Sequence, residues 1–141
     1  MQIARVGARY VLNALTLGLS YSNVQYGHDG LSKFSETEKL NSGAFFFDYR
    51  FTAVSSAGLA YNYTRTGGAA SASYSQLSFS YDYELSKITG LYVIAAYQSS
   101  SGTTLNSAGQ VIAANASIAS YGINSGTDTQ AVAIVGIIHR F

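Results

Sequence analysis

The sequence predicts an all-β fold, a transmembrane antiparallel up-and-down β-barrel, from three observations. The 141 residues include no Pro, Cys or Trp, and only 11% are charged, whereas soluble domains carry roughly 25%. Tyr is abundant, yet the mean hydropathy is only +0.12 and every apolar run is too short for a membrane-spanning helix, which needs about 20 apolar residues. Apolar and polar residues instead alternate, as expected where every second side chain faces lipid.

The alternation with period two recurs in seven segments, each of which is a predicted strand. They are residues 2–12, 15–27, 40–51, 56–66, 73–85, 89–100 and 129–141. Most are about twice the usual globular strand length and match the roughly 9–11 residues that cross a bilayer. Tight links follow the first, third and fifth strands, and longer links follow the second, fourth and sixth, which is typical of membrane barrels whose short turns are periplasmic.

The fifth segment separates the two faces most clearly. Leu77, Phe79, Tyr81, Tyr83 and Leu85 share one face, while polar residues from Gln76 to Glu84 share the other. A soluble β-sandwich would alternate in the same way. Strand length, turns without Pro, and Tyr placed toward strand ends favour the barrel. The sixth segment is ambiguous because both of its faces are apolar, which fits either a subunit contact or a packed interior.

Several function classes have no support in the sequence. The net charge of +1, without a local Lys/Arg cluster, argues against nucleic-acid binding. The absence of Cys excludes thiolate chemistry and Cys-ligated metals. His28 and Asp29 open a loop, but no third ligand or nucleophile accompanies them, so loop decoration is favoured over an outer-membrane enzyme. We therefore expect no catalysis and no cofactor.

Charged residues on the polar faces are the candidates for a pore lining. An arginine on the lipid face would cost about 2–4 kcal/mol at the midplane, so Arg5, Arg9 and Arg50 are expected to face the lumen. Such a row of guanidinium groups would favour anions. The acidic residues on the same faces are Asp48, Asp82 and Glu84. Alternatively, Arg50 and the rim residue Arg140 merely pair with these carboxylates and stiffen the wall.

Three stretches carry a family resemblance. The ending Gly136-Ile-Ile-His-Arg-Phe141 resembles the C-terminal signature that the barrel-assembly machinery reads, and it is similar to the Gly-x-x-His-x-Phe ending of general porins from β-proteobacteria. Tyr81-Asp-Tyr-Glu-Leu-Ser-Lys-Ile-Thr-Gly-Leu-Tyr92 resembles a strand–turn–strand of that family. Arg5-Val-Gly-Ala-Arg-Tyr10 and the strand after it resemble the hairpin that follows the barrel midpoint. The outward positions of the assembly signal would be Val135, Ile137, His139 and Phe141.

The resemblance implies a sixteen-stranded trimeric porin of the Gram-negative outer membrane. Its partners would be outer-membrane lipid, two further copies, the barrel-assembly machinery, and the small hydrophilic solutes and ions that diffuse through. Seven strands match only the C-terminal part, and bacterial single-chain barrels have even strand numbers, so residues 1–141 are expected to be one domain that is incomplete at its N-terminus. If residues 110–120 supply an eighth strand, a small structural or adhesin barrel without a pore becomes the alternative.

Overall fold

The computed structural model describes residues 1–27, 37–106, 108–118 and 123–141, and its regular structure there is entirely β. In these ranges no helix is long and apolar enough to span a membrane. The long strands are β1 (Gln2–Leu12), β2 (Leu15–Tyr26), β3 (Glu38–Thr52), β4 (Ser55–Gly67), β5 (Ala72–Glu84), β6 (Thr89–Leu105) and β10 (Thr129–His139). Three short strands lie between the last two: β7 (Val111–Ala113), β8 (Ser117–Ile118) and β9 (Ile123–Asn124).

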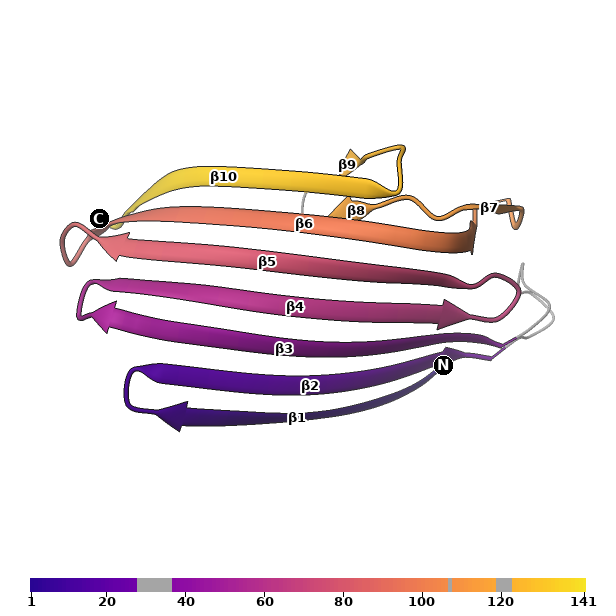
Figure 1. The fold of residues 1–141 in the computed structure, drawn as a ribbon, viewed down its shortest axis with the longest axis horizontal. Helices are drawn as coiled ribbons and strands as arrows, with labels where there is room; N and C mark the ends of the chain where they lie inside the picture. The colour runs from indigo at the N-terminus through magenta and orange to yellow at the C-terminus, as the bar shows by residue number, and fades with distance from the viewer. Residues whose placement is uncertain (28–36, 107, 119–122) are drawn as a thin grey trace.

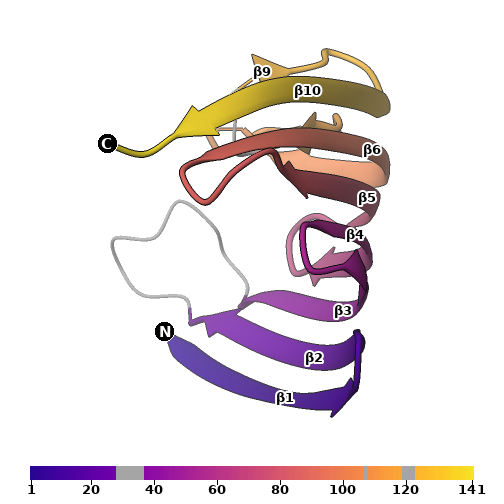
Figure 2. The same cartoon turned by 90° about the vertical axis from the view of Figure 1, so that its left-hand side faces the viewer.

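The seven long strands form one antiparallel sheet in the order β1-β2-β3-β4-β5-β6-β10 (Figure 1). Each strand therefore pairs with its neighbour in the chain, apart from the short strands inserted before β10. Seen along the strands, the sheet curves into an arc whose two edges are β1 and β10 (Figure 2). The predicted up-and-down topology is confirmed, and the arc has the form of a section of barrel wall.

The connections separate the two ends of the sheet. The links between β1 and β2, β3 and β4, and β5 and β6 lie at one end together with the C-terminus, and β2, β4 and β6 end at the other, where the longer links begin (Figure 1). Asn13, in the two-residue turn after β1, has a φ of 50°. Asn tolerates this left-handed conformation better than most residues, and tight hairpin turns require it. We call these ends the short-turn end and the long-loop end.

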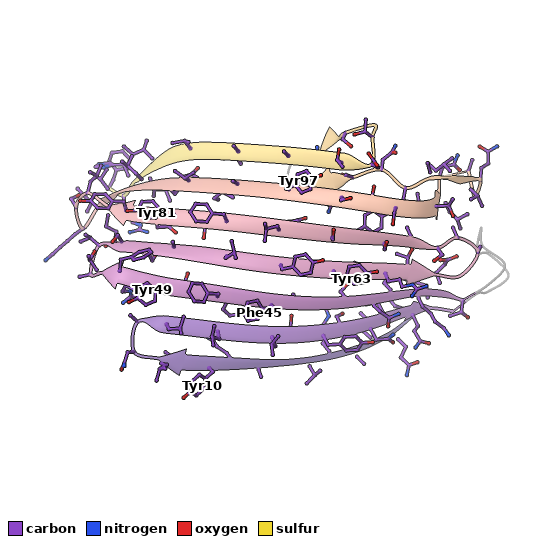
Figure 3. All side chains as sticks on the ribbon, in the orientation of Figure 1. Tyr10, Phe45, Tyr49, Tyr63, Tyr81 and Tyr97 are labelled. Carbon is purple, nitrogen blue, oxygen red and sulfur yellow. The ribbon has the colours of Figure 1, made fainter. Side chains whose placement is uncertain are left out.

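The convex face of the arc is apolar and uncovered. The labelled aromatic side chains, among them Tyr10, Phe45 and Tyr81, lie in front of the sheet in Figure 3, which is the convex side in Figure 2. Val6 is 68% exposed and Leu19 is 62% exposed. In the described ranges the buried hydrophobic residues are five small or medium-sized ones away from this face, four alanines and one isoleucine. A β-sandwich would bury such a face as its core, so this exposure contradicts the soluble alternative.

The apolar band on the convex face is nearly as tall as the apolar band of outer-membrane barrels. On β5 the band begins at Tyr83, near the end of the strand, and continues to Leu77. Leu85, just beyond the strand, extends the band at one end, and the polar residues Ser75 and Ser73 follow Leu77 at the other. Eight residue steps of about 3.3 Å span about 26 Å along the strand, or about 20 Å along the membrane normal at a tilt of about 40°. This approaches the apolar band of about 25 Å found on outer-membrane barrels.

Two expectations about strands need correction. β6 extends to Leu105 rather than ending at Ser100, because its last residues pair with β7 and with the start of β5. Residues 110–120 supply no eighth membrane strand in the part described here. They hold only β7 and β8, of three and two residues, against the roughly 9–11 that a crossing requires. In the described part of the chain, the alternative of a small closed barrel therefore lacks the eighth strand that it requires.

Candidate functional site

The middle of the concave face is recessed because its side chains are small. Gly58 and Ala60 on β4 lie beside Ser80 and Ser78 on β5. With Phe46 and Ile94 they line a hollow of about 250 Å³. A Cβ added at Gly58 would lie 2.8 Å from the Ser80 Oγ and 3.3 Å from a carboxylate oxygen of Asp48. Small residues here leave the space in front of the wall open.

Charges of both signs meet at the short-turn end of the concave face. Arg50, Asp82 and Glu84 line a hollow of about 290 Å³, and Asp82, Glu84 and Arg140 line an adjoining one of about 280 Å³. Ser56 separates Arg50 from Asp82 in the strand register. Within the described ranges neither arginine forms an ion pair with these carboxylates. We call this group the charged mouth, defined by Arg50, Asp82, Glu84 and Arg140.

Arg5 and Arg9 lie apart from the charged mouth. They occupy the edge strand β1, opposite Ser22 and Gly18, and both are exposed. Asp48 lies between the two groups along the wall, opposite Thr16 on β2. The structure thus places Arg50 beside Asp82 and Glu84, whereas Arg5 and Arg9 lie on the edge strand and form no ion pair in the described ranges.

Sequence reasoning missed a row of carboxamides across four neighbouring strands. Asn62 is the register partner of Gln76, Gln76 of Gln98, and Gln98 of Gln130. The Gln98 Nε2 donates to the Gln76 Oε1 at 3.1 Å, and the Gln76 Nε2 donates to the Ser78 Oγ at 3.1 Å. We call these four residues the amide row. Gln76 and Gln98 stand at equal distances from the turn between β5 and β6, so their pairing was visible in the sequence.

Two aromatic rings on the concave face cover glycines of the neighbouring strand. Phe46 lies over its register partner Gly18, where an added Cβ would be 1.9 Å from the ring. Tyr92 lies over its partner Gly136 in the same way, with 2.3 Å to the nearest ring atom. An aromatic side chain compensates for a glycine in a strand by covering its exposed backbone. These pairs account for the inward position of Phe46 on β3 and of Tyr92 on β6.

The C-terminal strand β10 and the two residues after it carry the residues predicted as the assembly signal. Val135 and Ile137 are 76% and 64% exposed. The His139 Nδ1 lies 2.8 Å from the Thr89 Oγ1, and its ring meets Phe141 edge-on with 4.8 Å between centroids. These contacts order the end of β10 at the rim. His28 and Asp29 lie outside the described residues, and elsewhere no group of three or more His, Asp or Glu side chains could hold a metal ion.

Comparisons with known proteins agree with this geometry. The model of the Gram-negative porin family matches residues 2–103. Two solved structures of OmpT from Vibrio cholerae share the fold. One, expressed in the outer membrane, has a TM-score of 0.68 at 14% identity and matches 98% of this chain and 41% of its own. The other, folded in vitro, has a TM-score of 0.65 at 13% identity, matching 96% and 40%.

The chain thus spans about two fifths of the length of the solved structures it matches. No curated protein sequence is significantly similar to it. The family match covers most of the chain, and the members of this family are non-enzymatic proteins of the outer membrane. By this match, and with a fold that agrees, the chain belongs to the Gram-negative porin family.

Proposed function

We propose that this chain forms part of the wall of a water-filled channel through which small hydrophilic solutes and ions diffuse passively. One observation carries the proposal: small and polar residues line the middle of the concave face, while the convex face is apolar and exposed. A lumen packed with interlocking side chains needs large residues where this wall has Gly58, Ala60, Ser78 and Ser80. This difference favours the channel over the filled structural barrel.

The proposal includes a mild preference for anions. At the charged mouth, Asp82 and Glu84 offset Arg50 and Arg140, so this end carries little net charge. Arg5 and Arg9 face the lumen on β1, apart from the charged mouth, and form no ion pair in the described ranges. Their field lowers the free energy of an anion and raises that of a cation in the lumen. The mechanism is size exclusion combined with this transverse field.

Reconstitution of the native protein in planar bilayers tests both statements. We expect stepwise conductance increases, and a reversal potential in a KCl gradient that shows chloride as the more permeable ion. Correctly folded protein that never conducts would support the filled barrel instead. A strong cation preference that is unaltered when Arg5, Arg9 and Arg50 are replaced by Gln would contradict the proposed selectivity.

We propose two kinds of protein partner. They are two further copies of the protein, which together with it form a homotrimer, and the barrel-assembly machinery. The trimer is supported by a shallow apolar hollow of about 440 Å³ on the convex side of β6 and β10, where Ala95, Ala131 and Ala133 leave room for close approach. Chemical cross-linking of the native protein in its membrane should then stop at three copies. The assembly signal is supported by the outward row that ends in Phe141, and a Phe141→Ala variant should accumulate unfolded in the periplasm.

A further inference from the structure

The chain turns back onto the wall after β6. β6 runs to Leu105 and pairs with β7, and the short strands β8 and β9 lie near the long-loop end of β6 and β10 (Figure 1). The Ala114 N–H donates to the Gly102 carbonyl at 3.0 Å, and the Ser100 Oγ donates to the Ala114 carbonyl at 2.9 Å. Residues 114–118, which we call the inward segment, therefore return along β6.

Two members of the amide row hold the inward segment. The Gln98 Oε1 accepts the Ser117 N–H at 2.6 Å, and the Gln130 Oε1 accepts the Ile118 N–H at 2.6 Å. Gln98 is the register partner of both Gln130 and the inward-facing Gln76, so the side chains of all three point to the concave side. The backbone that they bind must lie on that side too, over the concave face of β6 and β10.

The inward segment is the most tightly packed part of the described chain. Ala114, Ala116 and Ile118 are 4%, 0% and 5% exposed, and the wall residues Gln98 and Ser100 beneath them are 8% and 4% exposed. Elsewhere in the described ranges the buried residues are Gly18 and two alanines. The Ala116 N–H also donates to the Thr127 carbonyl at 2.8 Å, which ties the segment to the chain that enters β10. The packing is that of a fixed element.

The level of the segment follows from its anchors. Gln98 lies seven residues before Leu105, so the segment reaches about 23 Å from the tip of β6 along the strand, or about 18 Å along the membrane normal at a tilt of about 40°. Along β6, Gln98 lies between two convex-facing residues, Tyr97 in the apolar band and Ser99 beyond it. The inward segment therefore lies at the outer boundary of the membrane-facing band.

We propose that the inward segment narrows the outer part of the channel and sets the largest solute that passes, with Gln98, Gln130 and Ser100 as the residues that position it. This inference rests on the proposed channel function. Removing the two carboxamide anchors should release the segment, raise the single-channel conductance and admit larger sugars in liposome swelling.

A labelling experiment tests the placement without reference to conduction. The chain has no Cys, so Ala116→Cys and Ala113→Cys each give a single thiol in the native protein. Ala116 is fully buried and Ala113 is exposed. A membrane-impermeant maleimide should label A113C at least tenfold faster than A116C. Adding Gln98→Ala and Gln130→Ala should remove most of that difference, whereas Asn62→Ala, in the same row but without a bond to the segment, should preserve it.

The outcomes separate the inference from the channel function. Equal labelling rates at both positions in the parent protein would overturn the placement. If the anchors' removal exposes A116C but leaves conductance and sugar size limit unchanged in a conducting protein, the segment does not restrict the channel. If A116C is protected but no variant conducts, the channel function fails. Should the double variant not fold, Ser117→Pro removes one anchoring N–H and leaves the wall intact.

Discussion

Replacing Arg5 and Arg9 by Gln should shift the ion selectivity toward cations, by an amount that depends on salt. One guanidinium about 10 Å from an ion in water contributes about 0.4 kcal/mol, which screening at 0.1 M salt reduces to about 0.15 kcal/mol. The sign is opposite for anion and cation, so two arginines change their difference by about 0.6 kcal/mol. This corresponds to about a threefold change in permeability ratio.

The salt dependence distinguishes a field effect from altered pore geometry. At 0.01 M salt the same sum gives about a sevenfold change, and at 1 M it nearly vanishes, because the Debye length falls from about 30 Å to about 3 Å. Reversal potentials in KCl gradients measure this directly. Arg65→Gln is the matched control, since it removes the same charge from the convex face. If the change in permeability ratio is independent of salt, or equally large in the control, the selectivity does not come from the field of Arg5 and Arg9.

The remaining predictions concern the wall itself. Phe79→Arg places a charge on the apolar convex face and should lower the free energy of unfolding by about 2–4 kcal/mol, measured by reversible unfolding from liposomes. The control is its inward neighbour, where Ser78→Arg should cost far less. Equal costs at the two positions would contradict the assignment of faces. Gly18→Ala should destabilise the folded wall by about 1–3 kcal/mol, because the added Cβ meets the ring of Phe46. In a Phe46→Ala background the same substitution should cost little. If the two substitutions are additive, the contact between them is excluded. Thr89→Val removes the hydroxyl that forms a hydrogen bond with His139 and should lower the free energy of unfolding in urea by about 1 kcal/mol. An unchanged urea midpoint would show that this hydrogen bond contributes nothing to stability.

Much of the fold could be predicted from the sequence because the physics of a strand is local. Side chains alternate with period two, so Leu77 and Ser78 reveal their faces without any knowledge of neighbours. Hairpin pairing also follows from the short turns, since the turn after β5 fixes Gln76 opposite Gln98. Even the glycine and ring of Gly18 and Phe46 could have been matched once the strands were aligned.

What the sequence did not reveal depends on long connections. Gln98 pairs with Gln130 across a connection that contains β7, β8 and β9, so no turn fixes that register in advance. The inward path of residues 114–118 depends on hydrogen bonds between backbone and distant side chains, and a segment of Ala, Asn and Ser carries no pattern that announces it. The separation of Arg9 from Arg50 along the wall is likewise a property of register across three strands.

The central claim is that one face of this sheet meets water in an open lumen and the other meets lipid. A cysteine scan of β5, one position at a time from Leu77 to Asp82 in the native protein in liposomes, tests it directly. A water-soluble thiol reagent should label positions 78, 80 and 82 quickly and positions 77, 79 and 81 slowly. Uniform labelling of both faces, or protection of the inward positions as in a filled barrel, would contradict it.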